Sequence, residues 1–314
     1  MPNFQHLGLY FTPHHIQTAR QNRDRDVFQA AWQHLDDFVV DWGETEGESS
    51  ITALIVSGFR YRFNDDAAAA EQAVIQLLRG DSLDPAAYPT VFDALANAVA
   101  LAQAVELLRD HPALTPHLTA WLTRYAHFAD QLQHLPDDAT IVEQLWLGLL
   151  NLTSGLVLEA EDRFTAGVEA FQHAIQNEIR PEGYLPRATD GRDGGTFHRD
   201  FYAVAALVLM AEAASHAQLD LWSYTSRGIS VNTAAAYLTY YYYYPDQWRW
   251  DEGVDGFAKD LFKSAGGFLE LVNHHARPRD LKLLLDENRP FFNPILGGFT
   301  TLTHTLPPRK SLFG

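Results

Sequence analysis

Apolar residues recur at three- and four-residue spacing along almost the whole chain, whereas alternating, strand-like runs are scarce. This spacing places apolar side chains on one face of an α-helix and therefore favours an all-helical chain. Short links between the helices favour antiparallel neighbours in a bundle, a superhelical solenoid or a closed toroid. No repeat of solenoid length is visible, which disfavours the solenoid. The pattern predicts helices over residues 26–42, 50–63, 66–78, 88–109, 115–135, 138–158, 161–178, 199–217, 228–244, 255–274 and 278–286.

The chain shows no break in composition that would separate two domains. Its 314 residues are 46% hydrophobic, which is enough for one large core, and no linker rich in Pro, Ser or Gly divides them. We therefore expect one domain over residues 1–314. Residues 180–197 differ from the helical pattern because they are rich in Gly, Pro and Asp. Prolines and glycines also forbid a long helix near the end, so we expect an irregular tail from about residue 288.

The balance of charge argues against some functions. A formal net charge of −17 disfavours binding to nucleic acids, which requires a basic stripe. The same charge repels polyuronates, so such a ligand would need a local cluster of basic side chains. The chain shows no signal-peptide pattern and no uncharged stretch of membrane-spanning length. We expect no membrane association and a cytoplasmic location, or a periplasmic or secreted one if a signal was removed.

Metal and cofactor motifs are absent from the sequence. There is no cysteine, and the adjacent pairs His14-His15 and His274-His275 cannot each place both rings on one helical face. No nucleophile elbow, P-loop or dinucleotide fingerprint is present. We therefore expect no metal and no cofactor.

Candidate catalytic side chains are concentrated between residues 192 and 202, where a glycine-rich loop enters a long apolar helix. Arg192, His198, Arg199 and Tyr202 all lie in this segment. His198 and Tyr202 are four residues apart, so they share a helical face. The same residues also suit an ordinary helix start with capping charges and a half-buried tyrosine. On the residues alone, both interpretations stand.

Four motifs over residues 140–304 resemble the alginate lyase family in their order. They are the turn EGYLP at 182–186, the basic loop followed by HRDFY at 198–202, the helix end MAEAA at 210–214 with DLW at 220–222, and the closing GGFTTLTH at 297–304. The first half of the chain resembles the family more loosely. The resemblance implies an all-α fold, an (α/α) incomplete toroid of antiparallel helical hairpins like that of heparinase and chondroitin AC lyase.

The resemblance also implies a reaction and a substrate class. Family members are polysaccharide lyases that remove the C5 proton of a uronate and expel the C4 oxygen by β-elimination. The chain is therefore expected to bind a uronate-containing oligo- or polysaccharide. Carried over by motif position, Tyr202 is the base and the acid, and His198 is a pocket residue. Arg192 takes the place of the arginine that supports the tyrosine, with a loop one residue longer.

One family motif is changed in this chain. Relatives have an Asn-His pair a few residues before a Trp, and here Trp146 is preceded by Glu143 and Gln144 instead. The Gln144 amide, or a protonated Glu143, is the expected donor to the uronate carboxylate. Both residues equally suit a solvated helix start.

Aromatic faces and positive charges suit sugar rings and their carboxylates, although each such residue also has a packing interpretation. The further candidates for substrate binding are Trp146, Arg199, Trp222, Trp248, Arg60 and His304.

Two other functions suit the same residues. A glycoside hydrolase on a similar toroid would pair Asp193 or Asp200 with Glu143 as acid and base. A non-catalytic carbohydrate-binding protein would account for the missing Asn-His pair. The sequence sets neither the particular uronate nor the oligomeric state.

Overall fold

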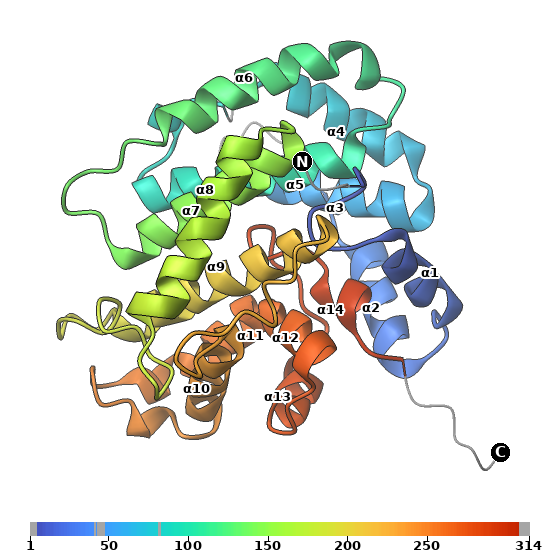
Figure 1. The fold of residues 1–314 in the computed structure, drawn as a ribbon. Helices are drawn as coiled ribbons and strands as arrows, with labels where there is room; N and C mark the ends of the chain where they lie inside the picture. The colour runs from blue at the N-terminus through green and yellow to red at the C-terminus, as the bar shows by residue number, and fades with distance from the viewer. Residues whose placement is uncertain (1–4, 41, 43–47, 81–82, 308–314) are drawn as a thin grey trace.

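The computed structural model describes residues 5–40, 42, 48–80 and 83–307, and the regular structure within them is helical apart from isolated bridges between Ser226 and Ile229 and between Asn293 and Gly298. Figure 1 shows the arrangement of the helices. They are α1 (Pro13–Gln21), α2 (Asp26–Asp37), α3 (Glu48–Asn64), α4 (Ala67–Arg79), α5 (Val91–Leu108), α6 (Leu118–Gln131), α7 (Ile141–Val157), α8 (Glu161–His173), α9 (Thr196–His216), α10 (Val231–Tyr243), α11 (Ala258–Ala265), α12 (Leu269–Ala276), α13 (Leu281–Asn288) and α14 (Thr300–His304).

The helices form an (α/α) toroid, as the resemblance implied. Helices α3, α5, α7 and α9 pack against one another in chain order, and α4 and α8 pack antiparallel beside α3 and α7. The last helix, α14, contacts α1, α2 and α12, so the first and the last helices lie side by side (Figure 1). The N-terminal ends of α5, α7 and α9 consequently meet at one rim of the ring, and their C-terminal ends meet at the other.

Helices α7 and α8 approach closely because glycines line their contact. A Cβ atom on Gly155 would lie 2.4 Å from the backbone nitrogen of Phe164, and one on Gly167 would lie 2.5 Å from that of Leu152. Neither space admits a side chain, so these glycines set the spacing between the inner and the outer helix.

Helix α5 runs through the middle of the fold. Thr90 caps its start by accepting a hydrogen bond from the N–H of Asp93 at 3.1 Å. By length and composition alone α5 could cross a membrane, with a mean hydropathy of 1.5, but 83% of it is buried inside the protein. Helix α5 is therefore buried as a core helix is. It belongs to a single hydrophobic cluster whose residues range from Leu9 to Leu302.

Two expectations about the C-terminal part need correction. The helix predicted over 255–274 is broken into α11 and α12 by a 3-10 turn at Gly266–Phe268. A Cβ atom on Gly267 would lie 2.6 Å from Oγ1 of Thr300, so the break lets α14 approach. The second correction concerns the tail that was expected to be irregular from about residue 288. It contains α14, a short helix whose five residues are all buried.

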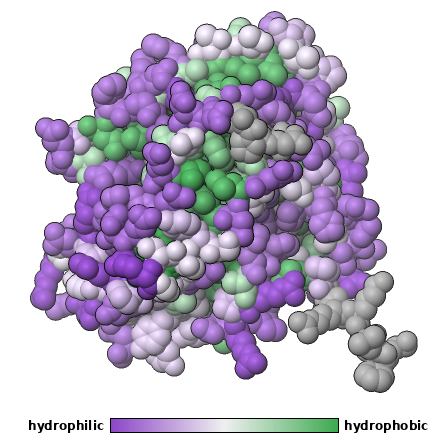
Figure 2. Space-filling view, viewed as in Figure 1, coloured by the Kyte–Doolittle hydropathy of each residue, from purple (hydrophilic) through white to green (hydrophobic). Residues whose placement is uncertain are grey.

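The face of the molecule drawn in Figure 2 is mostly hydrophilic, and apolar side chains show in patches near its middle, its top and its left edge. This distribution agrees with the high negative charge of the chain.

Candidate active site

The segment of residues 180–195 leads into α9 and is held in place by a side chain of that helix. Arg199 forms an ion pair with Asp193, with 2.8 Å between Nη1 and Oδ2. It also donates hydrogen bonds to the carbonyl oxygens of Ala188 and Asp190 at 3.0 and 2.9 Å. The guanidinium that we assigned to substrate binding thus fixes the loop, and it has little capacity left for a ligand.

The glycine-rich part of this loop is also held from its other side. Asp251 accepts hydrogen bonds from the N–H groups of Gly194 and Thr196 at 3.1 and 2.7 Å. Nε1 of Trp248 donates to Oγ1 of Thr196 at 2.8 Å. Trp248 is 4% exposed and packs edge-on against Phe197. Its ring therefore supports the loop from inside and offers no open face to a sugar.

Tyr202 lies further along α9 and is partly buried. Its ring packs edge-on against Phe92 and Phe201, at centroid distances of 5.4 and 5.8 Å. Its backbone carbonyl accepts a hydrogen bond from Nε1 of Trp146 at 3.1 Å. Because Trp146 is completely buried, it supports α9 behind Tyr202 and does not stack on a substrate. The catalytic role of Tyr202 stays a prediction.

His198 and Arg192 differ in how firmly they are held. The His198 ring stacks on Phe257, with 4.6 Å between centroids and 18° between planes. Burial lowers the pKa of His198, so its imidazole is neutral at pH 7 and brings hydrogen bonds rather than charge. Arg192 is exposed, and within the described ranges its guanidinium makes no hydrogen bond or ion pair.

Glu143 and Gln144 are both engaged at the start of α7. Glu143 accepts hydrogen bonds from the N–H and the hydroxyl of Thr140 at 2.7 and 2.8 Å, and the two residues form a capping box. The Gln144 side chain donates to the carbonyl of Ala139 at 3.0 Å and accepts from Arg187 at 2.9 Å. This placement matches the helix-start interpretation, and it adds Arg187 to the rim.

Three aromatic rings and an arginine line the same loop, and of these only Trp250 is a residue that the sequence suggests as a stacking face for sugars. Tyr184 and Trp250 lie 4.9 Å apart between ring centroids, and Tyr237 is 5.7 Å from Tyr184. The guanidinium of Arg249 lies over Tyr184 and Trp250, at 5.3 and 4.4 Å from their centroids. Arg249 and Trp250 are next to Asp251, which holds the loop, and only this tertiary contact brings them near α9.

The other three predicted binding residues lie away from this rim. Arg60 donates to backbone carbonyls at the C-terminal end of α2, at 2.6 to 3.3 Å. Nε1 of Trp222 donates to the carboxylate of Glu212 at 3.2 Å, and Nε2 of His304 lies 3.1 Å from it. Glu212 is ten residues beyond Tyr202 on α9, or about 15 Å along the helix axis. Arg60, Trp222 and His304 therefore have structural contacts outside the candidate site.

The three carboxyl groups proposed for a hydrolase do not assemble into an acid and a base. The hydrogen bond from Arg199 lowers the pKa of Asp193 to about 2. Asp200 is fully buried, where it accepts a hydrogen bond from the N–H of Leu185 at 3.0 Å, and burial raises its pKa to about 7. Glu143 caps α7. Each group already serves a loop or a helix end, so the hydrolase finds no support here.

An open groove of about 650 Å³ lies elsewhere, beside α1 and the C-terminal end of α3. Its arginines are already paired, Arg62 with Asp110 at 2.8 Å and Arg20 with Asp65 at 3.0 Å. A groove whose positive charge is neutralised in this way is poorly suited to a polyuronate.

A ring of paired helices with a basic, aromatic-lined loop at the start of α9 is the architecture of the toroidal polysaccharide lyases. A family model described as alginate lyase matches residues 48–248, which is more than half of the chain. The chain belongs to the alginate lyase family, and it is a polysaccharide lyase by that membership.

Solved structures share the fold over nearly the whole chain. Alginate lyase A1-III from Sphingomonas species A1 is 18% identical, with a TM-score of 0.72 over 93% of this chain and 95% of that one. A tyrosine-to-phenylalanine variant of A1-III complexed with a tetrasaccharide gives a TM-score of 0.75 at 17% identity, over 94% of each chain. An alginate lyase from Bacteroides ovatus gives 0.70 at 12% identity, over 98% and 100%. No curated protein matches the sequence.

Proposed function

We propose that this protein cleaves a uronate-containing glycan by β-elimination at the rim where α9 begins. Membership of the alginate lyase family and the shared toroid support this proposal. The tetrasaccharide complexes of A1-III variants support an oligosaccharide as the ligand.

The observation that carries the proposal is the pair of arginines at this rim without an ion-pair partner in the described structure. Arg192 makes no polar contact there, and Arg249 contacts only aromatic faces. In a chain of net charge −17, two guanidinium groups without a carboxylate partner, one of them over half-buried aromatic rings, form a local site for a sugar carboxylate. Arg187 and Arg199 add to the local positive charge, although each already pairs with a carboxylate.

The chemistry needs a base, an acid and neutralisation of the carboxylate. The C5 proton of the uronate passes to the phenolate oxygen of Tyr202, and the C5–H electron pair forms the C4–C5 double bond. The C4–O bond breaks, and the departing oxygen takes a proton from the Tyr202 hydroxyl. An arginine on the carboxylate stabilises the negative charge that develops at C5.

The test is the ultraviolet absorbance of the unsaturated uronate, followed during incubation with alginate, glucuronan, hyaluronan, chondroitin and pectate. We expect the wild type to produce it on at least one polymer and Tyr202→Phe to lose about 10²-fold or more of the rate. The fold should survive, because the described ring contacts of Tyr202 with Phe92 and Phe201 involve carbon faces that phenylalanine keeps.

Tyr244→Phe is the matched control, since Tyr244 is 52% exposed on the end of α10 and should leave the rate unchanged. New reducing ends without absorbance would reject elimination in favour of hydrolysis. Full activity of a folded Tyr202→Phe protein would reject Tyr202 as the base.

A further inference from the structure

Five histidines from four helices gather around one buried glutamate at the rim opposite the candidate active site. Glu212, near the end of α9, is 1% exposed. Nε2 atoms of His216, His275 and His304 lie 3.0, 2.7 and 3.1 Å from its oxygens. The fourth and fifth histidines are His15 of α1 and His274 of α12, whose rings lie 4.8 and 5.5 Å from the His304 ring. From the sequence, both His-His pairs were judged unsuited to a metal, yet one ring of the first pair and both rings of the second belong to this cluster.

Glu212 differs from the other buried glutamates of the described chain in its partners. Glu106 pairs with Arg109 at 2.8 Å, and Glu270 pairs with Arg289 at 2.6 Å. Glu212 has no lysine or arginine partner among the described residues. The group is therefore a buried carboxylate without a permanent cation, which is costly to bury.

The hydrogen bond on the far side of His304 indicates where its proton lies. The Thr303 hydroxyl approaches backbone carbonyls of the same helix at 3.3 Å, and its oxygen lies 2.7 Å from Nδ1 of His304. A hydroxyl that donates to a carbonyl accepts from Nδ1–H, which leaves the lone pair of Nε2 facing the Glu212 carboxylate. Two lone pairs at 3.1 Å repel unless a proton or a cation lies between them.

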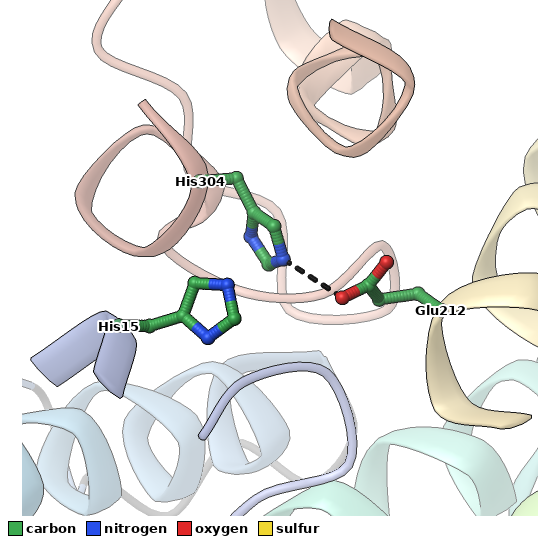
Figure 3. Close-up of side chains that lie close together, drawn as sticks. All are labelled: His15, Glu212 and His304. Carbon is green, nitrogen blue, oxygen red and sulfur yellow. Dashed lines mark hydrogen bonds and ion pairs between the residues drawn. The ribbon is translucent and has the colours of Figure 1, made fainter. Parts of the chain in front are cut away.

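We propose that His15, Glu212 and His304 form a binding site for a divalent transition metal ion, with Zn²⁺ as the best match. Their ligand atoms all lie within 4.8 Å of one another. Figure 3 shows the two rings and the carboxylate converging from α1, α14 and α9. Two imidazoles with one carboxylate is a ligand set that zinc uses, at about 2.0–2.2 Å from each atom. With these metal–ligand distances, the ligand atoms of a tetrahedral ion lie about 3.3 Å from one another. Nε2 of His304 and Oε1 of Glu212 are 3.1 Å apart, which is close to that spacing.

The surroundings provide the outer contacts that orient metal-binding histidines. Nδ1 of His304 faces the Thr303 hydroxyl. Nδ1 of His15 accepts the N–H of Thr12 at 3.0 Å, and the Thr12 hydroxyl lies at the same distance. Because Nδ1 accepts that N–H, the proton of a neutral His15 ring lies on Nε2. A metal bound at Nε2 would move this proton to Nδ1, which would then donate to the Thr12 hydroxyl and no longer accept the Thr12 N–H. His216 brings a third imidazole beside the site, with Nε2 3.0 Å from the Glu212 carboxylate, and its buried Nδ1 has no hydrogen-bond partner in the described structure.

A metal here would have a structural role. It would tie the first helix and the last helix to the end of α9, where the chain closes the ring. The candidate active site is at the other end of α9, so this site is independent of the proposed elimination.

The site is tested by titrating the chelator-treated full chain with Co²⁺, whose visible absorption reports its coordination, and with Zn²⁺ by calorimetry. We expect one equivalent of each to bind the wild type, and Zn²⁺ to raise its melting temperature in a concentration-dependent way. His15→Gln and His304→Gln should weaken Zn²⁺ binding by more than about 100-fold, and Thr303→Val by about 10- to 100-fold.

His14→Gln is the matched control, since His14 is exposed beside His15 and should keep full binding. Circular dichroism of each variant separates loss of the site from loss of the fold, and Thr303→Val tests the site if His304→Gln does not fold. Absence of stoichiometric Zn²⁺ or Co²⁺ binding to folded wild type would overturn the proposal and leave His304 as the protonated partner of Glu212. Equal loss of binding in His14→Gln would also overturn it.

Discussion

At the scale of single residues, the candidate site separates charges that are already used from charges that are free. The guanidinium of Arg199 donates to Asp193 and to two backbone carbonyls. That of Arg249 lies over two aromatic rings and has no carboxylate partner in the described structure. A substrate carboxylate competes with an existing ion pair in the first case and meets an unpaired guanidinium in the second. Arg249 is thus the better candidate for binding a uronate.

We expect Arg249→Gln to raise KM for the polymer substrate about tenfold with little change in kcat, because a lost charge contact of about 1.4 kcal/mol weakens the ground and transition states alike. Steady-state kinetics at several salt concentrations checks this, and the variant should depend less on salt. Arg163→Gln is the control, since Arg163 pairs with Asp130 on α8 and α6. An unchanged KM in Arg249→Gln would remove this residue from the site.

Asp200 lies between His198 and Tyr202 in sequence but points into the core. Its pKa is raised to about 7 by burial, and its Oδ2 has no hydrogen-bond partner in the described structure. The folded state therefore holds a proton that the unfolded chain releases near pH 4. The stability that this carboxyl group contributes is present below the unfolded pKa and is lost as pH rises toward 7.

We expect Asp200→Asn to be more stable than the wild type at pH 8 and close to it at pH 4. The difference in unfolding free energy should grow by at most about 1.4 kcal/mol per pH unit between these limits. The amide oxygen can still accept the hydrogen bond from Leu185, so the turn is retained. Urea unfolding from pH 4 to pH 8 measures the difference, and a constant difference would show that Asp200 titrates normally.

At the scale of the elements, the start of α7 shows a side chain for which two roles were open. The resemblance placed Glu143 at a substrate-binding position, and in the structure its carboxylate closes a capping box with Thr140. The two N–H groups bound in this box are among those that any α-helix leaves without partners at its start.

We expect Thr140→Ala to lower the unfolding free energy by about 1 kcal/mol without changing kcat. Glu143→Gln keeps an oxygen that accepts from Thr140, so it should retain most stability and activity. Thermal unfolding and the elimination assay together check both variants. A fall in kcat of about 100-fold in a stable Glu143→Gln protein would restore Glu143 as a catalytic acid.

At the scale of the whole molecule, one hydrophobic cluster connects the first and last helices through the ring. α14 contacts α1, α2 and α12, so a change in this short helix is felt at both ends of the chain. The single domain expected from the sequence stays a prediction, and cooperative unfolding tests it.

We expect urea unfolding to be one transition that coincides by near- and far-ultraviolet circular dichroism. Leu302→Ala, which empties a fully buried site in α14, should shift the whole transition by about 2–5 kcal/mol. Leu283→Ala is the control, because Leu283 is 53% exposed and should change stability by less than about 0.5 kcal/mol. Two separate transitions, of which Leu302→Ala moves only one, would divide the chain into two domains.

Local patterns were sufficient for the helices, the all-α class and the toroid resemblance. Helical spacing depends only on neighbours three and four residues away, and the ordered motifs of residues 182–304 identify the family without coordinates. The first helix, α1, was missed because its nine residues are mostly polar and offer few apolar positions from which to recognise a helix.

The sequence located the segment of the candidate site but did not predict which side chains line it. The loop before α9 and Tyr202 were found because they are contiguous. Trp146 and Trp248 were assigned to sugar binding, but both rings are buried. Burial of a ring depends on which distant segments pack over it, and helical periodicity does not contain that information. Arg249 was missed for the same reason.

The amino-acid sequence by itself determined the helices, the class of fold and the family, because these follow from short-range spacing and motif order. Tertiary structure alone decided which charges are free, which tryptophans are covered, and that His15, Glu212 and His304 meet. Residues nearly three hundred positions apart become neighbours only when the ring closes, and closure is a property of the packed core rather than of any single segment.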